Sequence, residues 1–267
     1  MKKIVLIVAA IAAVCLIALV VILTLSLGSI IKKGVETVGP QITKTEMKLA
    51  GASVSVLSGS GALKGFVLGN PEGYKTSAAI KFGEASVGVR PGSVLSDKMH
   101  VTHVRIVAPE ITFEGTLGTK NNLSKIMENV EAATGGADAG TKTADKPKTE
   151  PAGRGASKKL QVDDFLISGA KVNVSMTMLG GKALIVTIPD IHFTALGTGP
   201  EGITAGELTK KVLSQITTET LKAVEKAVTD LGKQATDIIK AATGKDATNS
   251  LDKAAKGIGD LFKKKQP

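Results

Sequence analysis

The chain has 267 residues and a formal net charge of +10, which is room for one large domain or two small ones beside an N-terminal segment. Aromatic residues make up only 3% of the sequence and Trp is absent. Because nucleic-acid bases are commonly bound by stacking on aromatic side chains, this composition argues against a nucleic-acid partner. The positive charge comes almost entirely from Lys, which favours either a solvated basic surface or a surface that faces anionic lipid.

The N-terminal stretch Ile4–Leu27 contains neither a charged residue nor a proline, and a pair of lysines flanks it on each side. A helix of about 24 residues is roughly 36 Å long, enough to cross a hydrocarbon core of about 30 Å. A cleaved signal peptide would instead carry an apolar core of roughly 7–15 residues before a small-residue cleavage site. The sequence therefore predicts a transmembrane anchor over residues 1–33, with the N-terminus in the cytoplasm.

Residues 34–43 are predicted to be a short tether, and strand patterns begin after it. The apolar alternation changes parity near Gly51, which predicts a β-bulge there. Pro109 interrupts the long alternating stretch Lys98–Glu114, so this strand should kink or lie at an edge. Tight turns between consecutive strands are typical of an antiparallel meander, which we expect over residues 44–133 together with a short terminal helix.

That short helix is predicted to start at Asn121 or Asn122, because Asn is a favoured N-terminal cap. Residues 134–159 contain no large hydrophobic residue and are predicted to be a disordered linker or a long loop. The sheet should continue over residues 160–232, where Thr204-Ala-Gly-Glu207 is a capping box that opens a long amphipathic helix. Residues 233–267 form a Lys-rich tail with a further amphipathic segment.

Taken together, these patterns predict an α+β fold in which a transmembrane helix precedes a curved antiparallel sheet. The sheet would form a groove or half-barrel covered by amphipathic helices. We favour one sheet over two, because each half alone is thin for an independent core.

The sequence contains no catalytic motif. His100 and His103 are three apart on a predicted strand and should point to opposite faces, as should the adjacent, solvated Asp163 and Asp164. No zinc-type spacing of Cys and His and no phosphate-binding loop occurs. We therefore predict that the protein is not an enzyme, uses no cofactor and has no metal site.

Each predicted strand has one apolar face, and such a face can be covered either by lipid or by protein. The side chains predicted to line an apolar groove are Val54, Val56, Val87, Val89, Val101, Ile106, Val172, Val174, Met176, Leu184 and Val186. The basic amphipathic tail could lie on a membrane surface or pack on the sheet as a helix. Its candidate membrane-surface residues are Lys253, Lys256, Ile258, Leu261, Phe262 and Lys263.

Several motifs resemble the N-terminal part of AsmA-like envelope proteins. The residues that carry the resemblance are Leu57-Ser-Gly-Ser-Gly61, Leu68-Gly-Asn-Pro-Glu-Gly73-Tyr, Val87-Gly-Val-Arg-Pro91, Ser93-Val-Leu-Ser-Asp97, Val104-Arg-Ile-Val-Ala-Pro-Glu110 and Asn121-Asn-Leu-Ser-Lys-Ile126. The likeness covers residues 1–133 and, more loosely, residues 160–232. Larger members are similar to bridge-like lipid transfer proteins with a chorein-like N-terminal region.

The resemblance implies a single-pass inner-membrane protein whose folded part lies in the periplasm. It implies binding or transfer of phospholipid through an apolar β-sheet groove in the maintenance of the outer membrane. A chain this short would need further copies, or a larger envelope partner, to bridge two membranes. The alternative is a structural or protein-interaction module of the envelope with a filled core.

Overall fold

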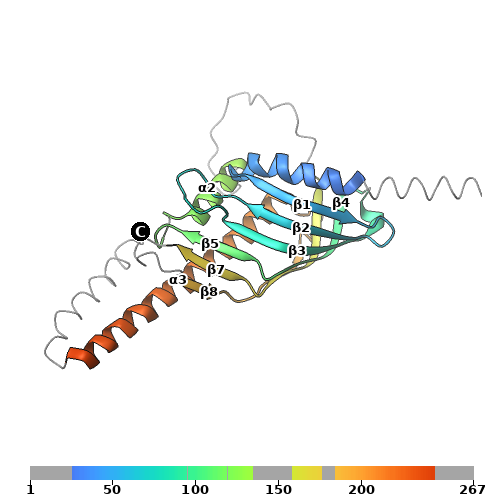
Figure 1. The fold of residues 1–267 in the computed structure, drawn as a ribbon. Helices are drawn as coiled ribbons and strands as arrows, with labels where there is room; N and C mark the ends of the chain where they lie inside the picture. Colours follow the sequence, from blue (N-terminus) through green and yellow to red (C-terminus); the bar gives the residue numbers. More distant parts are fainter. Residues whose placement is uncertain (1–25, 95, 119, 135–157, 176–183, 244–267) are drawn as a thin grey trace, which may run out of the picture.

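The computed structural model describes residues 26–94, 96–118, 120–134, 158–175 and 184–243 (Figure 1). A helix over residues 26–43 comes first. It is followed by β1 (Met47–Val54), β2 (Ser60–Leu68), β3 (Ile80–Val89), a short 3-10 helix η1 (Pro91–Ser93), β4 (Lys98–Val107), β5 (Glu110–Glu114), α2 (Asn122–Thr134), β6 (Lys159–Ser168), β7 (Lys171–Ser175), β8 (Leu184–Thr187), β9 (Ile191–Leu196) and α3 (Ala205–Thr243).

The nine strands of the described residues all belong to one sheet, as expected. Three pairs of strands are the two halves of longer, kinked strands: β4 continues into β5, β6 into β7, and β8 into β9. Both halves of each long strand keep the same register with the neighbouring strands. The pairs Lys98↔Lys159 and Glu110↔Lys171, for example, have the same offset in the sequence. The sheet is therefore built from six long strands.

The predicted antiparallel sheet is wrong, because the sheet is mixed. β1 to β4 form an antiparallel meander, but β4 pairs with β6, and β5 with β7, in parallel. Parallel neighbours need a crossover of a dozen or more residues. Residues 115–158 provide that crossover through α2, so the stretch predicted as a linker joins two parallel strands.

The transmembrane helix in the predicted fold is corrected as well. None of the helices in the described ranges is long and apolar enough to cross a membrane. Residues 34–43, predicted to be a tether, are the second part of the helix over residues 26–43. Residues 1–25 lie outside the described part of the chain.

The helix over residues 26–43 runs along the edge of the sheet beside β1 (Figure 1). The backbone N–H of Leu49 donates to Glu36 Oε1 at 3.1 Å, and Lys32 Nζ donates to the carbonyl of Ala50 at 3.5 Å. Gly28 allows a close approach, since an added Cβ would lie 2.2 Å from the carbonyl oxygen of Ala52. The helix thus covers an edge strand whose backbone groups would otherwise be unpaired.

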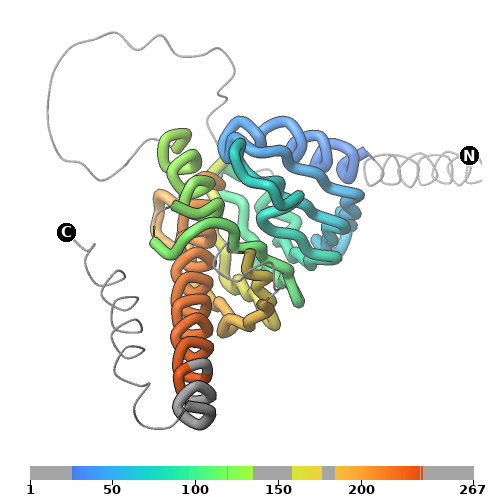
Figure 2. Tube along the Cα trace, turned by 60° about the vertical axis from the view of Figure 1, so that its left-hand side comes forward, coloured from blue at the N-terminus to red at the C-terminus, as the bar shows by residue number. Residues whose placement is uncertain are grey.

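The caps of the other two helices confirm the predicted helix starts. Asn121 Oδ1 accepts a hydrogen bond from the N–H of Ser124 at 2.8 Å, so Asn121 is the cap of α2. Thr204 Oγ1 accepts from the N–H of Glu207, and Glu207 Oε2 accepts from the N–H of Thr204, which is the reciprocal capping box. The first part of α3 packs against the sheet, and its later part extends beyond the strands (Figure 2).

A row of irregular residues crosses the whole sheet, and we call this row the crease. In β1 and β2, Leu49 pairs with Phe66 and Gly51 pairs with Lys64. Ala50 and Gly65 lie opposite each other between these two pairs, but they are not paired in the ladder. The registers of the other strands place one residue of each strand in line with these two. The crease consists of Ala50, Gly65, Gly83, Ala108, Gly169 and Pro189.

The crease resets the alternation of side chains. In a regular strand, residues an odd number apart point to opposite faces. Ile188 and Ile191, three apart across the crease, are nevertheless both buried in the same core, at 5% and 3% exposure. Gly65, Ala108 and Gly169 have φ values of 61°, 47° and 64°, which a regular strand does not contain. Each strand therefore bends while keeping its apolar side chains on one face.

A polar network fastens the segment between β2 and β3 to β5. The carboxylate of Glu114 accepts from the backbone N–H groups of Lys75 and Thr76 at 2.7 and 2.8 Å, and from Thr76 Oγ1 at 2.5 Å. Asn122, which is fully buried, donates to Asn70 Oδ1 and to the carbonyl of Thr112. Burial alone would raise the pKa of Glu114, but these hydrogen bonds outweigh it and the net shift of the pKa is downward.

We expect Gly65→Ala to lower the free energy of unfolding by about 1–3 kcal/mol, because an L-residue is strained at positive φ. The new methyl would also lie 2.6 Å from Ala50 Cβ. Gly83→Ala, at the matching position of the next strand, is the control, since nothing lies within 4 Å of its added Cβ. Urea denaturation measures both variants. Equal losses would contradict the special role of Gly65 in the crease.

The network around Glu114 predicts a pH dependence. Because the folded pKa of Glu114 lies below its unfolded value, its stabilisation is fully present above the unfolded pKa. It is lost as the pH falls through the folded pKa, so the midpoint of urea denaturation should drop in that acid range. Glu114→Gln should start from a lower midpoint and drop less. An identical acid drop in both proteins would exclude Glu114 as its source.

Candidate functional site: an apolar cavity at the crease

A cavity of about 450 Å³ lies between the sheet and two helices. One wall is the helix over residues 26–43 and the other is the first part of α3. The main floor residues are Met47, Phe66, Phe82, Ile106, Ile111 and Phe165, and the main wall residues are Val35, Val38, Ile42, Leu208, Val212 and Ile216. The volume falls in the range of small-molecule pockets, which is about 300–1,000 Å³.

The floor of the cavity flanks the crease on both sides. Ile106 and Ile111 line it from the two halves of one kinked strand, although they are an odd number of residues apart. Phe66 and Phe82 stack beside the crease with ring centroids 4.8 Å apart and planes inclined by 14°. The hollow therefore lies where the strands bend.

α2 holds both walls in place at one end of the cavity. Asn129 Nδ2 donates to the carbonyl of Thr43 at 2.8 Å, which ties α2 to the helix over residues 26–43. On the other side Lys210 of α3 pairs with Glu131 at 3.3 Å, and Gly206 fits against Thr134. Since Lys210 and Glu131 are largely exposed, this pair orients α3 more than it stabilises it.

No side chain in the lining of the cavity needs a polar partner from a ligand. No charged side chain lines it. Its two hydroxyl groups are already paired within their own helices, since Thr43 Oγ1 donates to the carbonyl of Gly39 at 3.0 Å and Thr209 Oγ1 to that of Ala205 at 2.8 Å. The carbonyl of Pro109 accepts from the N–H of Lys171. A ligand would be held by shape and apolar contact.

Exposure changes along the cavity. Val38 is 51% exposed, and the lining residues Gly34, on the same helix, and Ala205, on α3, are also exposed. In contrast, Thr43 and Ile111 are at most 1% exposed, and Ile216 is 5% exposed. The cavity is therefore open to solvent near Val38, whereas other parts of its lining are buried.

The predicted groove residues are mostly found elsewhere. Ile106 alone among them lines this cavity, in the described part of the chain. Val101, Val172 and Val174 are buried in the core, and Val87, Val89, Leu184 and Val186 are half-buried against it. Val54 lines a separate hollow at the β1–β2 hairpin, Val186 lines one beside α3, and Val56 is exposed. Met176, Lys253, Lys256, Ile258, Leu261, Phe262 and Lys263 lie outside the described residues.

Most residues that line the cavity were not predicted from the sequence. Val35, Val38 and Ile42 recur at helical spacing, a signal that was present in the stretch predicted as a tether. Leu208, Val212 and Ile216 belong to the helix that was predicted to be long and amphipathic. Amphipathicity alone did not show which part of the protein its apolar face contacts. Phe66 and Phe82 line the cavity only because the crease changes the face of the residues around it.

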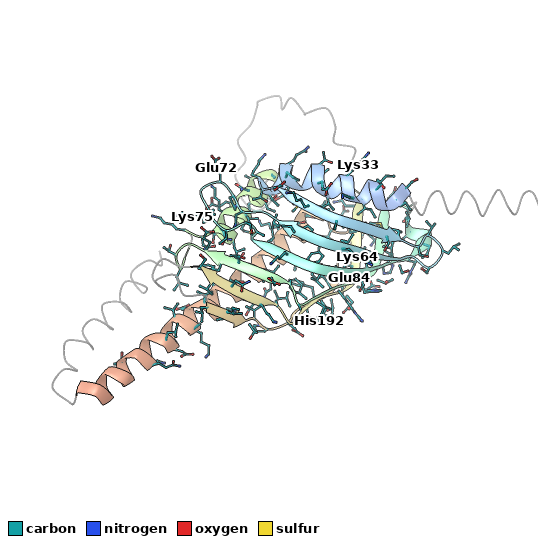
Figure 3. The ribbon with its side chains drawn as sticks, in the orientation of Figure 1. Lys33, Lys64, Glu72, Lys75, Glu84 and His192 are labelled. Carbon is teal, nitrogen blue, oxygen red and sulfur yellow. The ribbon has the colours of Figure 1, made fainter. Side chains whose placement is uncertain are left out.

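Charged and polar residues gather on the other surfaces of the sheet. Lys64 and Glu84 are exposed cross-strand neighbours beside the crease, and His192 is exposed on β9 (Figure 3). His192 Nε2 lies 2.6 Å from Asp164, and His100 Nε2 lies 2.6 Å from Asp163, so both carboxylates are paired rather than free in solvent. Hydrogen bonds from Gln161 and His100 lower the pKa of Asp163, and the bond from His192 lowers that of Asp164. Within the described ranges, no group of three or more His, Cys, Asp or Glu side chains could hold a metal ion.

Comparison with protein-family models, curated proteins and solved structures finds no match for this chain. The resemblance to AsmA-like proteins therefore stays a prediction from the sequence motifs.

The α3 wall carries one unusual polar group. Thr220 follows Ile216 on the same face of the helix, is fully buried, and its hydroxyl has no hydrogen-bond partner among the described residues. Thr43 is as buried, but its hydroxyl donates to Gly39 and accepts from Thr45 Oγ1 at 2.9 Å. Desolvation of an unpaired hydroxyl is costly, whereas a paired hydroxyl stabilises the fold.

We therefore expect Thr220→Val to raise the free energy of unfolding by about 1 kcal/mol, because the substitution removes an unpaired buried hydroxyl at similar volume. The same substitution at Thr43 should lower it by about 1–2 kcal/mol. Denaturant titration of the two variants measures both signs. A loss of stability in Thr220→Val would show that this hydroxyl has a partner after all.

Proposed function

We propose that the protein binds an acyl chain of a lipid in the cavity at the crease. The observation that carries the proposal is a hollow of about 450 Å³ without a charged lining residue, walled by two helices and floored by Phe, Ile and Met side chains. It is about three times as large as an engineered apolar cavity of about 150 Å³ that binds benzene.

The proposed activity is binding and release, which requires no catalytic residue. The protein would act as a lipid-binding or lipid-transfer accessory of the cell envelope, in keeping with the resemblance to AsmA-like proteins. The inner-membrane location with a periplasmic folded part stays a prediction from the sequence, as does the larger envelope partner.

The alternative of an interaction module with a filled core also has support. Phe113 and Val172 are completely buried, so the sheet toward α2 is filled by the protein's own side chains. Neither of these two residues lines the cavity, whose floor includes Phe82 and Ile106 instead. If the cavity binds no lipid, the filled core favours the alternative function, an interaction module.

The proposal is tested with a fluorescent reporter, which the chain allows because it has no Trp of its own. Phe82→Trp places a single indole on the cavity floor. Stearic acid carrying a doxyl quencher should quench its emission in a saturable way, and unlabelled stearic acid should reverse the quenching. Val107→Trp is the matched control, since Val107 is 65% exposed and is not a lining residue.

Saturable quenching of Phe82→Trp without quenching of Val107→Trp supports binding in the cavity. Equal quenching of the two would indicate non-specific adsorption and contradict the proposal. Absence of quenching in a folded Phe82→Trp protein would contradict it as well and favour the interaction module.

A further inference from the structure

We propose that one end of the sheet faces an anionic lipid bilayer and that Leu57 enters the apolar layer of that bilayer. We call it the hairpin end, because it carries the β1–β2 turn and the connection between β3 and β4. Its residues are 55–59, 90–94, 96–98, 158–159 and 197–204. The inference goes beyond the proposed function and does not depend on it, since none of these residues except Thr204 adjoins the lining and neither Leu57 nor Val94 is part of it.

The two turns of the hairpin end are held against each other. The N–H of Val89 donates to the carbonyl of Gly59 at 2.7 Å. An added Cβ at Gly59 would lie 1.9 Å from the carbonyl oxygen of Val89 and 3.0 Å from Pro91. This close approach leaves no room for a side chain at Gly59, so the two turns form one surface.

This surface carries exposed apolar side chains. Val56, Leu57 and Val94 are three of the eight large hydrophobic residues that are exposed in the described ranges, and Leu57 is the most exposed of them at 80%. At the opposite end of the sheet, the connection between β2 and β3 instead exposes Glu72 and Lys75 (Figure 3). Because grouped exposed apolar side chains mark a contact surface, the hairpin end is the one expected to meet an apolar partner.

Basic side chains lie beside these apolar residues. The basic residues of the hairpin end are Arg90, Lys98, Lys158 and Lys159, against the two acidic residues Asp97 and Glu201. Lys158 Nζ donates to the carbonyl of Val94, which places its charge next to an exposed apolar side chain. Lys98 Nζ donates to the carbonyl of Gly199 at 3.1 Å. Exposed apolar side chains together with an excess of Lys and Arg match the surface of a bilayer that contains anionic lipid.

The first described helix begins at the same end. Gly28 lies against the last part of β1, since its added Cβ would lie 2.2 Å from the carbonyl oxygen of Ala52. The helix over residues 26–43 therefore starts beside the β1–β2 turn (Figure 1). In the sequence, the stretch Ile4–Leu25 precedes this helix and contains no charged residue. An uncharged stretch is thus joined to the chain at the hairpin end, which favours a bilayer over a soluble protein as the partner.

The contact is tested with single-Trp variants of the full-length protein, which has no Trp of its own. Leu57→Trp places an indole on the hairpin end. Val107→Trp is the matched control, because Val107 is exposed but lies in the middle of the sheet, beside the crease. The vesicles contain phosphatidylglycerol and a phosphatidylcholine with a doxyl group near the head of one chain. They should quench Leu57→Trp and shift its emission to the blue, and leave Val107→Trp unchanged.

Equal quenching of the two variants, or no quenching of Leu57→Trp, would overturn the bilayer contact. Shielding of Leu57→Trp from iodide in the absence of vesicles would overturn it as well. Shielding that rises with protein concentration would then identify a second copy as the partner, and constant shielding would identify another part of the same chain. None of these results changes the quenching of Phe82→Trp by free stearic acid, so failure here is distinguishable from failure of the proposed function.

The preference for an anionic surface is tested by removing charge from the Leu57→Trp protein. Replacing Arg90 and Lys158 by Gln should weaken its association with the phosphatidylglycerol vesicles by about fivefold for each residue. Quenching measured against vesicle concentration gives this change. Lys75→Gln is the control, since Lys75 is exposed at the opposite end of the sheet. An equal loss in Lys75→Gln, or no loss in the double variant, would overturn the anionic surface as the partner.

Discussion

The crease is the constraint on which the rest of this structure depends. Six strands each place one irregular residue in the same row, and three of these, Gly65, Ala108 and Gly169, have positive φ. Without the irregular residue, the apolar side chains on one side of the bend would lie on the opposite face of the sheet from those on the other side. Because the irregular residues lie in register, the strands bend together and keep a single apolar face. The cavity is the space that this bend leaves under the two covering helices.

The parallel pairing of β4 with β6 and of β5 with β7 has a consequence for the cavity. It requires a crossover, and α2 lies in that crossover. From there α2 contacts the helix over residues 26–43 through Asn129 and α3 through Glu131. The connection that makes the sheet mixed thus also ties together the two helices that wall the hollow. Topology and site are therefore linked through one short helix.

Local features of the fold could be predicted from the sequence because their causes are local. The capping box at Thr204 and the change of parity near Gly51 are determined by a few neighbouring residues. The parity change is not the predicted β-bulge, because the β1–β2 register is the same before and after it, at Leu49↔Phe66 and Gly51↔Lys64, and neither strand has an extra residue. The kink at Pro109 is of the same kind, since Pro lacks the N–H that the ladder needs. The long amphipathic helix was predicted within residues 160–232 and extends to Thr243, because helix ends carry weaker signals than helix starts.

Features that depend on distant residues could not be predicted in this way. The crease is a row only through the registers of six strands, so Gly65 and Gly83 individually read as ordinary strand glycines. The second part of the helix over residues 26–43, predicted as a tether over residues 34–43, was missed because Gly39-Pro40 resembles a helix stop. It continues to residue 43 since Ile42 packs against the core and Thr43 is tied to Gly39 and to Asn129. The parallel join was missed because tight turns dominate each half of the sheet, and only the crossover reverses the direction.

The central proposal is that the hollow at the crease binds an apolar chain and is not merely a gap in the core. Native mass spectrometry of the intact, full-length protein tests this claim most directly. The account predicts a bound population heavier by the mass of one chain-bearing lipid, lost when Val212→Trp fills the cavity and retained in Val107→Trp. A folded wild-type protein that stays free of lipid after exposure to fatty acid and phospholipid would contradict it.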